Sequence, residues 1–186
     1  SGFYGSGKSH LAKMLRAVWL DGPFPDGATP RGITNLPATV QEHLTELTTQ
    51  GKRHGGLHAA SGTLGSGASG SVRLALLRVI FKSVGLPESY PYARFVMWLR
   101  NEGVLEAVRQ RVEANGFDWQ EELDNFYVAD GLHEALTEEM PRRFTSQSAC
   151  VETLNNMFPN VKDVSSDEML DAIKGDASDL HFEPFE

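Results

Sequence analysis

The sequence predicts a predominantly α-helical chain, with at most one or two short strands, that belongs to a larger α/β fold. Apolar residues recur at helical spacing through most of residues 71–175. Residues 2–9 instead form a Gly-rich turn of the kind that joins a buried parallel strand to a helix. Because only Ser1 precedes this turn, and one doubtful strand follows it, we expect most of the parent sheet to lie outside this chain.

The Gly-rich turn reads Gly-Phe-Tyr-Gly-Ser-Gly-Lys-Ser and matches G-x-x-x-x-G-K-S/T, the phosphate-binding P-loop. Glycines let the backbone approach a phosphate closely, and successive N–H groups at a helix start surround it. The pattern predicts that Lys8 reaches the β- and γ-phosphates as the catalytic cation, and that Ser9 ligates Mg²⁺. A histidine at position 10 is more often an ordinary helix residue, and a chance match in a Gly/Ser-rich loop is the alternative for the whole motif. The predicted ATP-binding residues are Gly2, Gly5, Ser6, Gly7, Lys8, Ser9 and His10.

A helix and then a loop follow the P-loop. Apolar residues stand at i, i+3, i+4 and i+7 from Leu11 to Val18, so residues 1–20 are predicted to hold the P-loop and its helix. Such stripes are far more often core surface than ligand sites, and we expect this one to be buried. Residues 21–35 contain six prolines and glycines, which predicts a loop without regular structure.

The rest of the segment 21–70 is predicted to hold one helix between Gly/Pro-rich loops. Pro37 favours the first turn of a helix, and Gly51 is typical of its end. Residues 55–70 contain six glycines and predict a loop, within which residues 57–60 predict a short strand.

From residue 71 to 175 the pattern is almost entirely helical. Asp118 and Ser165 each stand three residues before a glutamate, which is the spacing of a capping box at a helix start. Because no internal repeat or linker is evident, residues 1–186 are predicted to form a single partial domain that ends in an acidic tail, 176–186. The predicted helical stretches are 74–84, 91–99, 105–112, 118–126, 132–140, 151–158 and 165–173.

Two further motifs bear on nucleotide binding. Residues 65–70 spell G-x-G-x-x-G, but no strand of adequate length precedes them, so a flexible loop is the favoured interpretation. A weaker alternative is that the helix beginning near Ser71 presents its N-terminus to an anion. Residues 126–130 approximate the acidic Walker B segment of an ATPase, yet their helical pattern favours a helix end. We therefore expect the Walker B residues to lie outside this chain.

The composition limits the class of partner. The chain has 17 Lys and Arg against 25 Asp and Glu, a net charge of −8 at pH 7, so its overall charge does not support DNA or an anionic membrane as a partner. The single cysteine, Cys150, excludes an internal disulfide and fits a reducing, cytoplasmic setting with an inert thiol. No apolar run approaches the ~18 residues of a membrane span, and no Cys/His spacing indicates zinc.

Residues 1–15 and two downstream helices resemble the large P-loop ATPase of bacterial BREX and phage-growth-limitation defence systems. That family carries an aromatic residue after the first P-loop glycine and Ser-His after the lysine, as Phe3, Ser9 and His10 do here. The sequences Leu-Ala-Leu-Leu-Arg-Val-Ile-Phe at 74–81 and Ala-Arg-Phe-Val-Met-Trp-Leu at 93–99 are also similar.

This resemblance implies an AAA+-like α/β P-loop NTPase fold as the parent domain. It implies ATP and Mg²⁺ as cofactors, hydrolysis coupled to a conformational change, and other defence-system proteins as partners, and it leaves phage DNA and an oligomer open. The Walker B residues and the arginine finger of the family would then lie beyond residue 186, so the chain alone is expected to be inactive.

Two other functions stay open from the residues. The chain could be a helical interaction module whose P-loop remnant binds no nucleotide. It could also be a small nucleotide or nucleoside kinase with an acceptor site in the helical region, although no acceptor-binding motif favours this.

Overall fold

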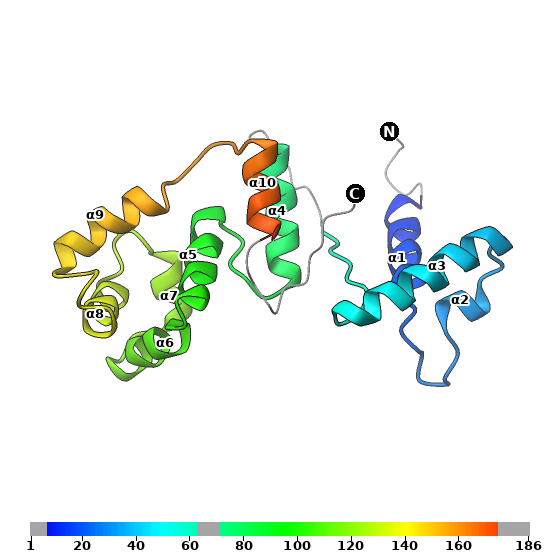
Figure 1. Cartoon of the computed structure of the whole chain (residues 1–186), viewed down its shortest axis with the longest axis horizontal. Coiled ribbons are helices and arrows are strands. Elements are labelled where there is room, and N and C mark those ends of the chain that lie inside the picture. Colours follow the sequence, from blue (N-terminus) through cyan, green and yellow to red (C-terminus); the bar gives the residue numbers. More distant parts are fainter. Residues whose placement is uncertain (1–6, 63–70, 175–186) are drawn as a thin grey trace. The chain divides into compact units, whose positions relative to one another are not determined.

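The computed structural model describes residues 7–62 and 71–174 as helices joined by turns and loops (Figure 1). The predicted helical character is confirmed, and no strand forms among these residues. The strand predicted at residues 57–60 is therefore wrong. A lone extended segment has no neighbouring strand to pair its backbone groups, and here the carbonyl of His58 accepts a hydrogen bond from the indole Nε1 of Trp19 at 2.9 Å. The α/β parent fold stays a prediction.

The chain forms two compact units, which we call the N-terminal unit, Ser1–Ser61, and the C-terminal unit, Gly62–Glu186. The single domain predicted for residues 1–186 stays a prediction, because two compact units can belong to one domain. The N-terminal unit contains α1 (Lys8–Leu20), α2 (Pro30–Ile33), α3 (Ala38–Gly51) and a 3₁₀ turn (Lys52–His54). The C-terminal unit contains α4 (Val72–Ser83), α5 (Tyr90–Asn101), α6 (Leu105–Ala114), α7 (Trp119–Asp124), α8 (Asp130–Glu139), α9 (Gln147–Met157) and α10 (Ser166–Lys174).

Helix α2 corrects the expectation that residues 21–35 hold no regular structure. Pro30 occupies the first turn of α2, where its missing N–H leaves no hydrogen bond unmade. The Oγ1 of Thr29 caps this turn by accepting a hydrogen bond from the N–H of Gly32 at 3.2 Å. The Pro/Gly content of the segment thus marks a helix start as well as a loop.

Helix α3 agrees with the prediction at both ends. Pro37 lies immediately before its first residue, and Gly51 is its last. A Cβ at Gly51 would lie 2.8 Å from Cδ2 of Leu57, so glycine allows the chain beyond the helix to fold closely over its end.

Local signals set the helix ends of the C-terminal unit as predicted. The Oδ1 of Asp118 accepts hydrogen bonds from two N–H groups of the first turn of α7, each at 2.9 Å. Ser165 and Glu168 form a reciprocal capping box: the Glu168 N–H donates to Ser165 Oγ at 3.1 Å, and the Ser165 N–H donates to Glu168 Oε2 at 2.7 Å. Gly85 and Gly116 follow α4 and α6 with left-handed φ angles of 73° and 87°.

The core of the C-terminal unit is a cluster of aromatic rings around Phe95 of α5. The Phe95 ring meets the rings of Phe126 and Phe158 edge to face, with centroids 4.8 and 5.6 Å apart. Helix α8 packs against α6, α7 and α9 beside this cluster. Such edge-to-face pairs add stability beyond the burial of the rings themselves, so this unit carries a real hydrophobic core. Its largest fully buried side chains include Phe81, Phe95, Phe126, Phe144, Leu77, Leu99, Leu132, Leu136 and Leu154.

Candidate nucleotide-binding site

The predicted P-loop enters the described structure at its last three positions, Gly7, Lys8 and Ser9, and His10 follows them. Gly2, Gly5 and Ser6 lie outside the described residues. Gly7 precedes α1 in the left-handed conformation, with φ 77°, and its carbonyl accepts the first helical hydrogen bond, from the Leu11 N–H at 2.9 Å. Residues with a Cβ rarely adopt this φ. The backbone conformation at position 7 therefore favours the glycine that the motif requires there.

The first turn of α1 has features that favour anion binding. Lys8, Ser9 and His10 are its first three residues, and all three are exposed. No acidic side chain lies in this turn, and no side chain caps it. The leading N–H groups of a helix have no partner within the helix, and the helix dipole places positive charge there. The structure thus brings Lys8, Ser9 and His10 together at one helix start.

The apolar stripe of α1 is not buried, contrary to the expectation from its spacing. Leu11, Met14 and Leu15 are 57%, 46% and 61% exposed, and no residue of α1 is buried. Helical spacing shows which face of a helix is apolar, but it does not show what covers that face. Of the residues of this stripe, only Val18 at its end is partly buried.

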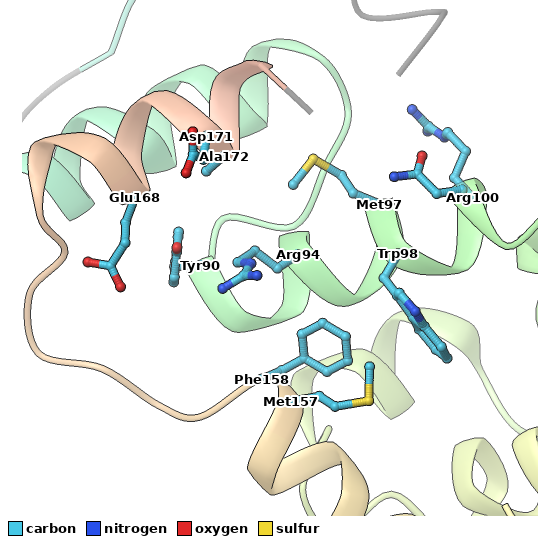
Figure 2. A pocket seen from close by; sticks show the side chains of 11 residues that line it. Tyr90, Arg94, Met97, Trp98, Arg100, Met157, Phe158, Glu168, Asp171 and Ala172 are labelled. Atoms are coloured by element: carbon cyan, nitrogen blue, oxygen red, sulfur yellow. The ribbon is translucent and has the colours of Figure 1, made fainter. Parts of the chain in front are cut away.

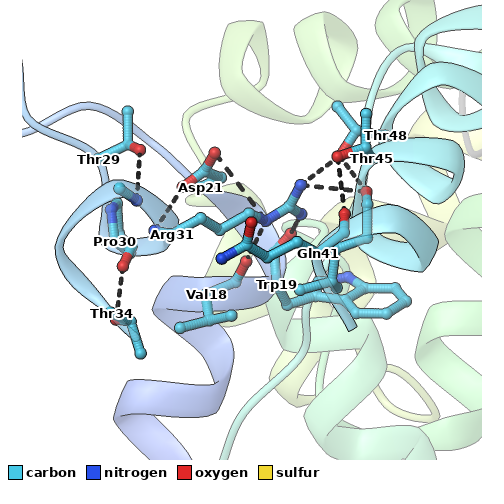
Figure 3. Close-up of polar contacts among 12 residues, drawn as sticks. Val18, Trp19, Asp21, Thr29, Pro30, Arg31, Thr34, Gln41, Thr45 and Thr48 are labelled. Carbon is cyan, nitrogen blue, oxygen red and sulfur yellow. Dashed lines mark hydrogen bonds and ion pairs between the residues drawn. The ribbon is translucent and has the colours of Figure 1, made fainter. Parts of the chain in front are cut away.

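The opposite end of α1 is held by Arg31, the first-turn arginine of α2 (Figure 3). The Nε of Arg31 donates to the carbonyl of Val18 at 2.7 Å, and its second terminal nitrogen donates to the carbonyl of Trp19 at 2.7 Å. The other terminal nitrogen donates to the carbonyl of Leu44 at 3.0 Å and to Oγ1 of Thr48 at 2.8 Å in α3. One side chain therefore joins all three helices of the N-terminal unit.

Electrostatics favour this position for a cation. The last carbonyls of a helix carry partial negative charge, and an arginine fork can reach several acceptors at once. Asp21 adds a carboxylate whose Oδ2 lies 3.9 Å from Nε of Arg31, while its Oδ1 accepts from the Arg31 N–H at 2.9 Å. The Arg31 side chain is only 13% exposed. The role of Arg31 could not be predicted, because nothing in the spacing of residues 21–35 relates it to α1 or α3.

The other two nucleotide motifs contribute nothing to this site. The G-x-G-x-x-G segment at 65–70 lies outside the described residues. The helix start after it is capped by its own sequence, since Ser71 Oγ accepts from the Leu74 N–H at 3.2 Å. The helix-end interpretation of residues 126–130 is confirmed, because Asp130 begins α8 and the residues before it form a turn.

Two buried titratable groups lie in the C-terminal unit. His133 in α8 is 2% exposed, and its Nε2 lies 3.1 Å from the carbonyl oxygen of Phe126. Burial lowers the pKa of His133, against a smaller opposing effect of that hydrogen bond. Cys150 is fully buried, and burial raises its thiol pKa to about 12, which fits the inert thiol expected from the sequence. The burial of His133 was not predicted from the sequence.

Neither metal-binding nor membrane-spanning features add to the site. No group of three or more His, Cys, Asp or Glu side chains in residues 7–62 and 71–174 could hold a metal ion. No helix in the same part of the chain is long and apolar enough to cross a membrane.

Comparison with known proteins gives no relative. No protein-family model, no curated protein and no solved structure matches this chain.

Proposed function

We propose that this chain carries the phosphate-binding part of a P-loop ATPase that binds ATP and Mg²⁺. The observation that carries the proposal is the P-loop pattern with Gly7 in the left-handed conformation directly before α1. In this arrangement Lys8 would bind the β- and γ-phosphates, Ser9 would ligate Mg²⁺, and the N–H groups of the first turn would bind phosphate oxygens.

The exposed stripe of α1 also supports the proposal. A P-loop helix packs one face against the sheet that supplies the preceding strand. Leu11, Met14 and Leu15 form such a face, and all three are exposed. The resemblance to the BREX ATPase family extends the proposal to the whole protein: a cytoplasmic ATPase of anti-phage defence that couples hydrolysis to a conformational change and acts with other defence-system proteins.

Calorimetric titration of the chain with ATP and Mg²⁺ tests the assignment. Lys8→Ala should weaken ATP binding by about 1.5–3 kcal/mol, the usual contribution of a hydrogen bond to a charged group, which corresponds to about 10- to 100-fold in Kd. Lys13→Ala is the matched control, because Lys13 is an exposed lysine on the same helix, away from its N-terminus. AMP, which lacks the β- and γ-phosphates, should bind more weakly than ATP.

The exposed stripe also favours a second function, that of a helical interaction module whose P-loop binds no nucleotide. The same titration separates the two functions. Absence of ATP binding, or equal affinity in the wild-type chain and in Lys8→Ala, would favour the interaction module and overturn the nucleotide-binding proposal.

A further inference from the structure

One pocket of the C-terminal unit takes no part in the proposed nucleotide site. Its walls come from α5, the end of α9 and α10, and its volume is about 410 Å³ (Figure 2). Ligand pockets in proteins commonly measure about 300–1,000 Å³ and have mainly apolar walls with a few polar groups. The apolar residues that line this pocket are Tyr90, Met97, Trp98, Met157, Phe158 and Ala172.

The charged side chains of the lining balance one another. Arg94 and Arg100 stand on α5, and Glu168 and Asp171 stand on α10 (Figure 2). An ionised ligand would give up its hydration in a pocket that supplies no net opposite charge, which costs free energy. The charge balance therefore favours an uncharged occupant.

Arg94 interacts with groups of the protein itself. Its guanidinium carbon lies 5.7 Å from the centroid of the Tyr90 ring. Hydrogen bonds from Ser165 have the largest effect in lowering the pKa of Glu168, and the positive charge of Arg94 lowers it further. The guanidinium and the carboxylate thus offset each other without any ligand.

The aromatic part of the lining is ordered by its own contacts. The guanidinium carbon of Arg143 lies 4.8 Å from the centroid of the Trp98 ring, and the Phe158 ring lies 5.8 Å from the same ring. A wall that is already in place lowers the ordering cost of binding. Met97 and Met157 complete it with flexible thioethers, which adapt to irregular apolar shapes and pack well against aromatic rings.

The lining also offers two neutral hydrogen-bonding groups. The indole N–H of Trp98 and the side-chain amide of Asn101 have no hydrogen-bond partner among the described residues. Both can donate to an uncharged acceptor, such as a carbonyl oxygen or a ring nitrogen. A ligand can therefore be oriented in this pocket without carrying a charge.

We propose that this pocket binds an uncharged, mainly apolar small molecule that contains an aromatic ring. The apolar walls favour burial of the ligand body, and the rings and thioethers favour an aromatic one. The balanced charges select against ions. The proposal does not depend on the nucleotide site, which lies in the other unit.

The test uses two fluorescent probes with the same ring system. N-phenyl-1-naphthylamine is uncharged, and 8-anilinonaphthalene-1-sulfonate carries one negative charge on the same skeleton. Both become brighter in apolar surroundings, so each can be titrated with the full chain. The uncharged probe should bind at least about tenfold more tightly, because the sulfonate would be buried without a net opposite charge. Equal or tighter binding of the sulfonate would overturn the proposal.

Nuclear magnetic resonance locates the bound probe. N-phenyl-1-naphthylamine should shift the indole N–H resonance of Trp98 in ¹H–¹⁵N spectra assigned by triple-resonance methods. Trp119 belongs to the same unit but lies outside the lining, so its indole resonance is the internal control. A probe that shifts Trp119 as much as Trp98 binds elsewhere, and that result would contradict the proposal.

Filling the pocket should block it. Ala172→Trp places a large side chain in the wall that α10 supplies and should weaken binding of the uncharged probe at least about tenfold, since apolar space that the probe needs is then occupied. Leu170→Trp is the matched control, because Leu170 is 41% exposed on the same helix and lies outside the lining. Equal losses in the two variants would refute the assignment to this pocket.

A charge variant tests the balance without changing side-chain size. Asp171→Asn leaves the lining with one net positive charge, so the sulfonate probe should bind about two- to fivefold more tightly, the effect of one partly exposed charge. Binding of the uncharged probe should not change. Asp167→Asn is the control, because Asp167 is exposed on the same helix and lies outside the lining. If the sulfonate bound Asp171→Asn and the wild-type chain equally, charge balance would not select the ligand and the proposal would fail.

Discussion

Replacing Arg31 with alanine should loosen the N-terminal unit while leaving the C-terminal unit intact. The Arg31 side chain donates four hydrogen bonds, to the carbonyls of Val18, Trp19 and Leu44 and to the hydroxyl of Thr48. Alanine removes all four donors, although the Leu44 carbonyl still accepts a hydrogen bond from the Thr48 hydroxyl at 2.8 Å. Because α1 and α3 contain no buried residue, little apolar packing is available to hold them in place instead.

The loss of stability expected for Arg31→Ala can be estimated from these contacts. A hydrogen bond to a charged group contributes about 1.5–3 kcal/mol, so a simple sum over four bonds would exceed 6 kcal/mol. The acceptors lie near the surface, and water can replace part of the lost bonding once the side chain is gone. We therefore expect a loss of about 3 kcal/mol, close to the cost of breaking a partly buried charged network. Arg31→Lys keeps the charge but loses the planar fork, and should cost about half as much.

Hydrogen exchange measured by mass spectrometry reports the two units separately. A loss of about 3 kcal/mol corresponds to about 100-fold faster exchange, expected for amides of residues 8–54 in Arg31→Ala. Amides of residues 72–174 should exchange at the wild-type rate. Arg16→Ala is the control, since Arg16 is an exposed arginine of α1 that forms no hydrogen bond or ion pair with a described residue. If residues 8–54 exchanged within twofold of wild type in Arg31→Ala, Arg31 would not hold the three helices together.

Three further predictions concern the C-terminal unit. Phe95→Ala should lower the free energy of unfolding by about 3–5 kcal/mol in urea denaturation, because it empties the centre of the aromatic cluster; a loss below about 1 kcal/mol would contradict that central position. Because burial lowers the pKa of His133 in the folded chain, the unfolded chain binds the proton more readily. The contribution of His133 is therefore complete above about pH 6.5 and declines as the pH falls below that value, by at most about 1.4 kcal/mol per pH unit. Between pH 7 and 5, the free energy of unfolding measured by urea denaturation should change less with pH in His133→Gln than in the wild-type chain. An equal change in both would assign the pH dependence to other groups. The Cys150 thiol is fully buried with a pKa raised to about 12, so it should react with a thiol-specific reagent only as fast as the unit unfolds; rapid reaction under native conditions would refute this.

Helix positions in the C-terminal unit could be predicted because the signals that set them are local. Asp118 and Ser165 bond to N–H groups two or three residues away, so the pattern that identifies them is contained in one turn. Gly85 and Gly116 act through their own φ angles.

The N-terminal unit was harder to predict because its contacts join distant parts of the chain. The acceptors of Arg31 stand 12 to 17 residues away in Trp19, Val18, Leu44 and Thr48, and no regular spacing connects them. The strand predicted at residues 57–60 failed for a related reason, since strand formation depends on a partner that local sequence does not reveal.

In the candidate site, too, local features could be predicted from the sequence and contacts with distant residues could not. The motif predicted which residues begin α1, and Gly7 has the left-handed conformation that suits its position. Burial of the α1 stripe could not be inferred, because spacing places Leu11 and Leu15 on one face without identifying the surface that covers it. The burial of His133 could not be predicted, because the sequence around a single histidine does not identify its hydrogen-bond partner, the carbonyl of Phe126.

The two ends of α1 have a joint consequence for how motion passes through the N-terminal unit. Gly7 and Asp21, on either side of the helix, both have left-handed φ angles, 77° and 51°, and Asp21 is the one non-glycine residue with positive φ in the described part of the chain. The 13 residues between them make a rod of roughly 20 Å that cannot lengthen by a turn at either end without changing these conformations. A shift of α1 along its axis would therefore change the hydrogen bonds that Arg31 donates to Val18 and Trp19, and with them the position of the side chain that also bonds α3.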